Sequence, residues 1–269
     1  MNRIEFKEKL KKIKCVLLDL DGTVYIGNGL IDGADEAIER FRQKGVQIVY
    51  LTNNSSKTSA EYVEKLSHMG VCKEGDFVLT SAEATARYLL DNGLNEDVYF
   101  LATDKIKNSF LSAGIKLCES NAKTAVLAYD TELDYKKACA FNREIICGAK
   151  YIATHADKVC PSEGVYLPDA GSFIALFNAS SQKMPEVVIG KPNTFMGDII
   201  KKKYGFNSYE IMMVGDRLYT DVRFGKNCGF LTALVLSGET DERAYEVSED
   251  KADGVFDDLL SLSRLLYSR

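Results

Sequence analysis

Two aspartates, Asp19 and Asp21, end an apolar run in the sequence DLDGT. Alternate side chains of a strand face the same side, so we expect both carboxylates at one strand end, with Leu20 turned into the core. Two carboxylates this close repel each other unless a proton or a cation compensates their charge, and a hard cation such as Mg²⁺ suits an all-oxygen site. Gly22 then lets the backbone turn tightly. The segment therefore predicts a metal site beside reactive carboxylates.

A second acidic segment, GDRLYTD, follows the apolar run IMMV. Asp216 stands where that strand is expected to end, so it can supply another carboxylate to the same metal. Asp221 lies about one helical turn further on and is expected to orient the metal ligands. A single acidic residue after a strand can be a simple helix cap, but two such segments in one chain favour the metal site.

Two other strand ends carry groups suited to phosphate. Thr52, in LTNNSS, offers a hydroxyl, and the backbone N–H groups of Asn53 and Asn54 can form an anion-binding nest. Lys191, in GKPN, can neutralise phosphate charge as a point cation. Either feature alone is weak. Beside the two acidic segments they predict a phosphate site next to the metal, to which we also assign Gly22.

The elements that must position these residues are short apolar runs alternating with amphipathic stretches. We expect strands at 15–20, 46–52, 98–102, 124–129, 150–155, 186–190, 210–216 and 231–238, and helices that include 34–45, 59–70 and 193–205. Strands that are apolar on both faces and separated by helices predict a doubly wound, Rossmann-like parallel sheet covered on both sides. Ligands of such folds bind beyond the carboxyl ends of the strands, where the polar segments above stand.

These segments resemble the motifs of the haloacid-dehalogenase-like hydrolase superfamily, and the resemblance covers essentially the whole chain. The motifs occur in the family's order: DxDGT at residues 19–23, a Ser or Thr at a strand end at Thr52, a Lys at Lys191, and GDxxxD with Asp216 and Asp221. Together the four motifs are a specific signal, whereas DLDGT alone would be a moderate one.

The long interval between the second and third motifs is similar to that of the NagD or para-nitrophenyl-phosphatase-like branch. It is too long for a loop, so the resemblance implies a catalytic core at 1–79 and 186–269 with an inserted α/β cap at 80–185. The segment from 151 resembles the cap signature of that branch, with His155 in place of the usual Asn and residues 169–172 for its glycine-rich element. Relatives acting on pyridoxal phosphate carry a His near the position of Cys160, which makes that substrate a poor candidate.

The resemblance implies a phosphatase that forms an aspartyl-phosphate. Asp19 would be the nucleophile, and Asp21 would be the acid and base, which requires a carboxyl pKa well above the ordinary value. Mg²⁺ would be held by Asp19, the backbone carbonyl of Asp21 and Asp216. Thr52, Lys191 and the N–H groups after Thr52 would hold the phosphoryl oxygens.

In the inserted segment, His155 and Asp157 follow an expected strand and are candidates to reach the leaving group. For His155 a buried structural role is an equal alternative. The side chain of Asn53 is either a substrate ligand or a turn residue.

Two alternatives remain from the residues alone. A phospho-accepting receiver module also combines an Asp cluster, a Thr or Ser and a Lys, but it is much shorter and lacks the inserted segment. A second alternative is a scaffold that binds without turnover. Asp21 argues against haloacid dehalogenation, since the metal-free dehalogenases of the superfamily lack that second aspartate.

The amino-acid composition limits the classes of partner that the chain is expected to bind. A formal net charge of −5 disfavours non-specific nucleic-acid binding. The cluster of lysines at 7–14 is typical of the solvated face of a short helix. The seven cysteines form no CxxC pair, which indicates a reducing compartment. Without an apolar segment long enough for a signal core or a membrane span, we expect a cytoplasmic enzyme.

Its expected substrates are small phosphate esters such as sugar phosphates, nucleoside monophosphates and para-nitrophenyl phosphate, and a homodimer is possible.

Overall fold

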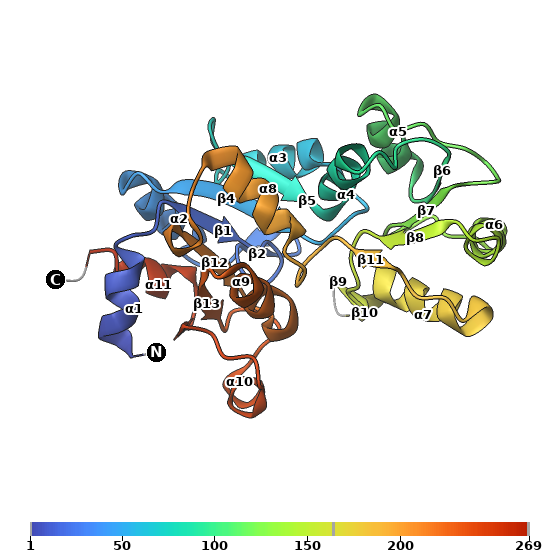
Figure 1. Ribbon diagram of the computed structural model, residues 1–269. Helices are drawn as coiled ribbons and strands as arrows, with labels where there is room; N and C mark the ends of the chain where they lie inside the picture. The colour runs from blue at the N-terminus through green and yellow to red at the C-terminus, as the bar shows by residue number, and fades with distance from the viewer. Residues whose placement is uncertain (1, 163–164, 268–269) are drawn as a thin grey trace. The chain divides into compact units, whose positions relative to one another are not determined.

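The computed structural model describes residues 2–162 and 165–267. Its α/β chain, shown in Figure 1, divides into two compact units. The first unit comprises Met1–Thr52, Tyr62–Leu79 and Lys191–Arg269, and the second comprises Asn53–Glu61 and Thr80–Gly190. The second unit is therefore an insertion in the sequence of the first.

A six-stranded sheet is the centre of the first unit. Its strands, in spatial order, are β14 (Gly254–Phe256), β13 (Leu231–Val235), β12 (Ile211–Gly215), β1 (Cys15–Leu18), β4 (Gln47–Thr52) and β5 (Phe77–Thr80). The strand β1 runs parallel to both of its neighbours, with Leu18 opposite Val214 of β12 and Tyr50 of β4. The carboxyl ends of β1, β4 and β12 therefore meet at one edge, where the sequence places its candidate residues.

Helices cover both faces of this sheet. The helices of the first unit are α1 (Arg3–Leu10), α2 (Ala34–Gln43), α3 (Ser59–His68, of which the residues up to Glu61 group with the second unit), α8 (Phe195–Tyr204), α9 (Arg223–Cys228), α10 (Glu242–Val247) and α11 (Leu259–Arg264), with a 3-10 turn at Ser208–Glu210 and a π-helical turn at Leu218–Val222. Met212 and Val214 pack on the side of α2 and α11, whereas Met213 lies against Gly225 of α9. This alternation buries the strands on both sides and confirms the doubly wound core.

The buried residues of α2 show why the segment folds as a helix. Ala34, Ala37, Ile38 and Phe41 are buried at helical spacing, and Gly45 follows with φ +72°. The stretches expected at 34–45, 59–70 and 193–205 each end in a glycine of positive φ, and the helices stop one or two residues before it. A left-handed residue cannot continue a right-handed helix, so these glycines set the helix ends.

The second unit has a parallel sheet of its own. The strands, in order, are β11 (Val187–Val188), β8 (Lys150–Ala153), β7 (Thr124–Leu127) and β6 (Val98–Leu101). The helices are α4 (Ser81–Asp91), α5 (Asp104–Ser112), α6 (Tyr135–Ile146) and α7 (Ala170–Ser181), and β9 (Val159–Ser162) pairs with β10 (Val165–Pro168). Phe141 of α6 contacts the rings of Tyr151 and Phe177 on one face of the sheet, and Phe110 of α5 contacts Phe100 on the other. The unit thus has its own two-sided core.

The strand expected at 186–190 lies elsewhere than predicted. It is reduced to Val187–Val188 and pairs with Ile152 and Ala153 of β8, so it is an edge strand of the second sheet and not the last core strand before Lys191. An apolar run does not specify its partner strand. Contacts also group Asn53–Glu61 with the second unit, so the units differ from the predicted boundaries at both connections.

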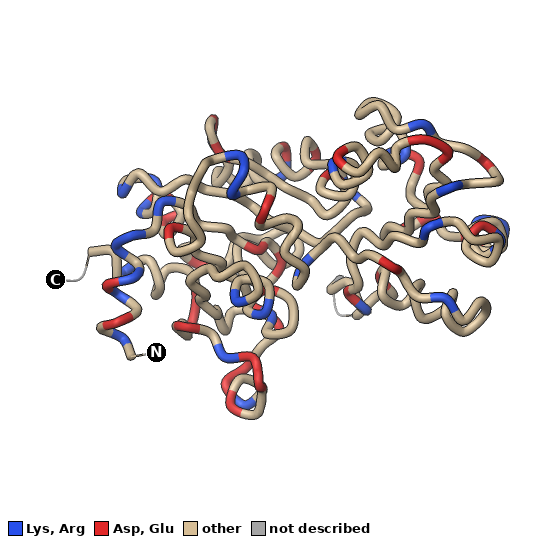
Figure 2. Tube along the Cα trace, in the orientation of Figure 1, with Lys and Arg blue, Asp and Glu red and all other residues tan. Residues whose placement is uncertain are grey.

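Charges of both signs alternate along the chain, as Figure 2 shows. The predicted lysine-rich helix is α1 and the turn after it, where Lys9 pairs with Glu5 and Lys11 with Glu8.

Within residues 2–162 and 165–267, no helix combines the length and the apolar character that crossing a membrane requires. All seven cysteines are free thiols, and burial raises the pKa of Cys15 and Cys228 to about 12.

Glu210 gives a test of pH-dependent stability that is remote from the candidate site. Its carboxylate contacts Lys14 Nζ at 2.6 Å and accepts from Asn207 N at 2.8 Å. Lys14, followed by Asn207, lowers the pKa of Glu210 to about 2. Because a lowered carboxyl pKa stabilises the fold above the ordinary pKa of 4.5, this contribution must fade as the pH falls toward 2.

We therefore expect Glu210→Gln to have a lower melting temperature than the wild type at pH 7, with the difference shrinking between pH 4.5 and 2. Thermal unfolding across this range measures it. The exposed Glu74 is the matched control, because Glu74→Gln removes a carboxylate without such contacts. A difference that stays constant with pH would contradict the role of the Glu210 charge.

Candidate active site

Three carboxylates converge at the carboxyl ends of β1 and β12. Asp19 follows β1, and Asp216 and Asp221 follow β12. The backbone joins the two segments, since Asp19 N donates to Val214 O at 2.9 Å. One oxygen from each carboxylate lies within 4.8 Å of the others, a grouping that could hold a metal ion. The two acidic segments therefore form one cluster, as their positions after neighbouring parallel strands require.

Lys191 lies within this cluster and bridges two of its members. Its Nζ is 2.5 Å from Asp19 Oδ1 and 2.6 Å from Asp221 Oδ1, and it is 3.5 Å from the carbonyl of Leu51 in β4. The Lys191 side chain is only 2% exposed. A buried ammonium requires such partners, because desolvation strongly disfavours an isolated charge.

Asp221 is held on both sides. Its second oxygen, Oδ2, accepts from the backbone N–H of Arg217 at 3.1 Å, and its side chain is 1% exposed. A Cβ added at Gly215 would lie 2.3 Å from Asp221 Cβ, so only glycine leaves room for this side chain. With both oxygens engaged, Asp221 is suited to orient Lys191.

Asp216 presents a buried oxygen that lacks a hydrogen bond. Its Oδ2 accepts from Glu239 N at 2.7 Å, whereas Oδ1 has no hydrogen-bond partner among the described residues. Glycines surround the carboxylate: a Cβ added at Gly238 or Gly22 would lie 2.1 or 2.4 Å from Oδ2. A buried carboxylate oxygen without a donor needs a proton or a cation, so the residues present fit a hard cation.

The electrostatics of the cluster follow from burial and mutual repulsion. Burial raises the pKa of Asp19; Lys191 opposes this, and the charges of Asp221 and Asp216 add to it. Burial and the charge of Asp221 raise the pKa of Asp216 to about 7. Burial disfavours the charge of Lys191, but Asp19 and Asp221 outweigh it and raise the Lys191 pKa. The lysine therefore stays charged, and a cation that binds the carboxylates competes with protons.

Asp21 stands in the tight loop that follows the strand. Gly22, with φ +85°, donates its N–H to Tyr25 O at 2.8 Å, and Ser237 Oγ donates to Gly22 O at 2.8 Å. The loop leads into a short hairpin, β2 (Tyr25–Ile26) and β3 (Gly29–Leu30). The metal-competent grouping of side chains contains Asp19, Asp216 and Asp221, and the metal contact of the Asp21 backbone carbonyl stays a prediction.

The residues of LTNNSS divide between the two units. Thr52 is the buried last residue of β4, next to β1 in the sheet. The Asn53 amide donates to both oxygens of Asp157, at 3.1 and 3.2 Å. Asn54 Oδ1 accepts from the N–H and the hydroxyl of Ser56 at 2.9 and 2.8 Å. Both asparagine side chains thus hold the second unit together, and the phosphate contacts of their backbone N–H groups stay a prediction.

His155 is completely buried in the second unit. Its Nε2 lies 3.1 Å from Ser55 Oγ and 3.5 Å from Asp169 Oδ1, and its Nδ1 lies 3.7 Å from Asp157 Oδ2. Asp169 Oδ1 also accepts from Ala170 N at 2.6 Å, at the start of α7. These contacts favour the structural alternative for His155. The sequence did not reveal Ser55 as a neighbour of His155, because Ser55 lies in a segment distant in the chain.

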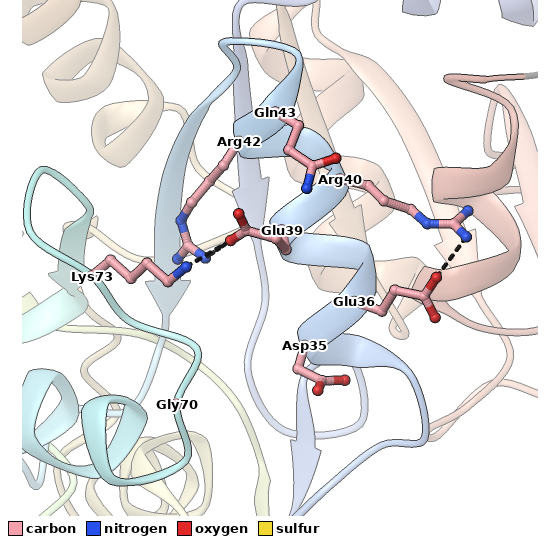
Figure 3. A pocket seen from close by; sticks show the side chains of 8 residues that line it. All are labelled: Asp35, Glu36, Glu39, Arg40, Arg42, Gln43, Gly70 and Lys73. Atoms are coloured by element: carbon pink, nitrogen blue, oxygen red, sulfur yellow. Dashed lines mark hydrogen bonds and ion pairs between the residues drawn. The ribbon is translucent and has the colours of Figure 1, made fainter.

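A separate hollow in the first unit lies along α2 (Figure 3). Its lining consists of Asp35, Glu36, Glu39, Arg40, Arg42, Gln43, Gly70 and Lys73. Arg40 pairs with Glu36 at 2.6 Å, and Lys73 pairs with Glu39 at 2.8 Å. Because its basic side chains are paired with carboxylates, we assign no ligand to this hollow.

Comparisons with known proteins agree with the geometry. A family model described as haloacid dehalogenase-like hydrolase matches residues 16–116, and a second, HAD-hydrolase-like model matches residues 188–262. The chain is 32% identical over 243 residues to the acid sugar phosphatase of Staphylococcus haemolyticus, covering 90% of this chain and 91% of the relative.

Two solved structures extend the similarity to the fold. The 4-nitrophenylphosphatase of Thermotoga maritima is 40% identical, with a TM-score of 0.92 over 95% of this chain and 98% of its own. A putative NagD protein is 38% identical, with a TM-score of 0.87 over 96% of this chain and 99% of its own.

Proposed function

The chain belongs to the haloacid dehalogenase-like hydrolases, as a phosphoric monoester hydrolase of the NagD and para-nitrophenylphosphatase branch, and we propose that it hydrolyses small phosphomonoesters through an aspartyl-phosphate on Asp19 with Mg²⁺ as cofactor. The observation that carries the proposal is the buried bridge from Lys191 to Asp19 and Asp221, with Asp216 beside it. The inserted unit and the family membership exclude the receiver-module alternative.

The reaction begins with attack of an Asp19 oxygen on phosphorus, in line with the ester oxygen. The bond from Asp19 to phosphorus forms as the bond to the ester oxygen breaks, and Asp21 gives its proton to the departing oxygen. Water then attacks the acyl phosphate and loses a proton to Asp21. The bond between Asp19 and phosphorus breaks, which returns both carboxyls to their starting states.

Positive charge must offset the charge that gathers on the phosphoryl oxygens. Lys191 supplies a buried ammonium 2.5 Å from the nucleophile, and Thr52 supplies a hydroxyl at the neighbouring strand end. Asp19, Asp216 and the backbone carbonyl of Asp21 would hold Mg²⁺, which when bound would neutralise part of this charge. We further propose that the unit Thr80–Gly190 acts as a cap, with Asp157 near the leaving group and His155 positioning Asp157.

The names of the relatives support the proposed substrate class of small phosphate esters. A relative named an acid sugar phosphatase supports sugar phosphates, and a neighbour named 4-nitrophenylphosphatase supports para-nitrophenyl phosphate. Nucleoside monophosphates belong to the same proposed class of small esters. We place the activity in the cytoplasm, and we leave the homodimer as a prediction.

The decisive experiment is a phosphate-release assay on a panel of these esters, with Mg²⁺ and after chelation with EDTA. We expect turnover with the metal and loss of turnover without it. A folded protein that releases no phosphate from any ester of the panel in the presence of Mg²⁺ would refute the proposal and favour the binding-scaffold alternative.

Gly238 tests the proposed metal role of Asp216. A Cβ at this position would lie 2.1 Å from Asp216 Oδ2, so Gly238→Ala must displace the carboxylate. We expect the variant to need about tenfold more Mg²⁺ for half-maximal activity, in the range seen when groups that orient metal ligands are altered. A magnesium titration of the rate measures this.

Gly29→Ala is the matched control, because its Cβ would come no closer than 3.9 Å to a neighbouring atom and its φ is not positive. We expect this variant to respond to Mg²⁺ like the wild type. Identical titrations of Gly238→Ala and wild type would remove Asp216 from the metal site.

A further inference from the structure

The hydroxyl of Tyr25 lies beside the carboxyl of Asp21. Its oxygen is 3.4 Å from Asp21 Oδ2, and Tyr25 is only 1% exposed. The backbone ties the two residues together: Tyr25 N donates to Leu20 O at 3.2 Å, and Gly22 N donates to Tyr25 O at 2.8 Å. Because the residues on either side of Asp21 bond to the backbone of Tyr25, the loop itself sets the distance between the two side chains.

Lys65 holds the ring of Tyr25 from α3. Its Nζ lies 3.6 Å from the ring centroid, a cation over an aromatic face. The same Nζ donates to Gly27 O at 2.8 Å, in the turn between β2 and β3. One lysine thus fixes both the ring and the hairpin that carries it.

The hydroxyl of Tyr25 stays a hydrogen-bond donor. A phenol has an ordinary pKa of about 10, so it is protonated and can donate at neutral pH. The phenol therefore remains protonated while Asp21 gains and loses its proton, and Asp21 Oδ2 can accept from it in either state.

We propose that Tyr25 is a positioning residue that sets the orientation of the Asp21 carboxyl for proton transfer. This inference rests on the acid–base role of Asp21 in the proposed function. In this proposal Oδ2 accepts from Tyr25, and Oδ1 is the oxygen that carries the acidic proton of Asp21. That proton passes to the ester oxygen as its bond to phosphorus breaks, and the resulting carboxylate keeps the hydrogen bond from Tyr25. No proton leaves Tyr25.

The dependence on the leaving group separates this role from general support of the fold. A nitrophenolate departs without needing a proton, whereas an alkoxide needs one from a correctly oriented acid. The ratio kcat/KM reports the steps up to departure of the leaving group, so it isolates the step in which Asp21 is the acid.

The experiment compares Tyr25→Phe with wild type in the presence of Mg²⁺. The two substrates are para-nitrophenyl phosphate and the alkyl ester of the panel that the wild type hydrolyses fastest. We expect kcat/KM for the alkyl ester to fall by about tenfold and that for the nitrophenyl ester to change less than about twofold. On an Asp21→Asn background, Tyr25→Phe should cause no further loss, because the carboxyl that it orients is gone.

Tyr151→Phe is the matched control. Tyr151 is buried in the second unit, and its hydroxyl has no hydrogen-bond partner in the part of the chain that the structure describes. This variant should keep wild-type kcat/KM for both esters. If Tyr25→Phe does not fold, Lys65→Met releases the ring while keeping the hydroxyl, and it should give a smaller loss that is again confined to the alkyl ester.

Equal losses for both esters, or no loss for either, would overturn the positioning role while leaving the proposed function intact. A wild-type protein that releases no phosphate from any ester of the panel in the presence of Mg²⁺ would instead refute the proposed function, and with it the role of Tyr25. A loss confined to the alkyl ester supports the inference.

Discussion

The Asp19→Asn variant is expected to fold and to lose phosphate release by at least about 10⁴-fold, the scale seen when an enzyme loses its nucleophile. The amide of asparagine cannot form the acyl phosphate. The other residues of the cluster can then bind and position the ester, but they supply no nucleophile. The phosphate-release assay with Mg²⁺ measures the loss.

The fold should tolerate this change because of the electrostatics of the cluster. Burial raises the Asp19 pKa, with the charges of Asp221 and Asp216 adding to it. A carboxyl whose pKa is raised in the folded state loses its stabilising contribution as the pH rises through that pKa. Asparagine keeps the shape, its amide oxygen can still accept from Lys191, and Lys191 keeps Asp221 as its counter-ion, so we expect the variant to remain folded at neutral pH.

Asp21→Asn is the informative comparison for this variant. It keeps the nucleophile and removes the base, so acid-quenched samples should accumulate phosphorylated Asp19 when para-nitrophenyl phosphate is the substrate. Asp19→Asn should accumulate no such adduct. Retained turnover in Asp19→Asn would remove Asp19 from the role of nucleophile, and normal turnover in Asp21→Asn would contradict the acid–base assignment.

Lys191→Met is expected to have the largest effect on stability as well as on activity. The lysine is 2% exposed and contacts Asp19 and Asp221 at 2.5 and 2.6 Å. Its removal leaves buried carboxylates without their counter-ion, which in other proteins lowers the free energy of unfolding by about 3–5 kcal/mol. Denaturant unfolding in EDTA at neutral pH measures this loss, and phosphate release should also be lost because the ammonium no longer faces the phosphoryl oxygens.

Added Mg²⁺ should restore part of the stability of Lys191→Met and stabilise it more than the wild type. The cation and the lysine neutralise the same carboxylates, so the absence of one increases the effect of the other. An equal effect of Mg²⁺ on both proteins would show that the metal does not share this cluster.

Lys137→Met is the matched control in the second unit. Lys137 Nζ lies 3.0 Å from Asp130 Oδ2, whose side chain is fully buried. Removing this lysine should also lower stability, but Mg²⁺ should not restore it, because the carboxylate does not belong to the metal-competent grouping that contains Asp19.

The amino-acid sequence by itself determined the fold class and the placement of Asp19 and Asp216 at one edge of the sheet. Asp19 and Asp216 could be placed because each follows an apolar run, and carboxyl ends of parallel strands share one edge of a sheet. The helix ends at Gly45, Gly70 and Gly205 were also readable, because a left-handed glycine is a local property of the backbone.

The tertiary structure decided which side chains meet. Val187 and Val188 joined the sheet of the second unit because strand pairing depends on the available partner and not on the apolar run itself. The polar group around His155 joins Ser55, which lies 100 positions away in the chain, with Asp169 at the start of α7, and these buried polar atoms become neighbours only after packing. The sequence likewise predicted Lys191 as a phosphate ligand, but only the tertiary structure showed that its ammonium bridges Asp19 and Asp221. The spacing of residues along the chain decides toward which face of a helix or strand each side chain points. Contacts between distant segments depend instead on how the whole core packs to exclude water.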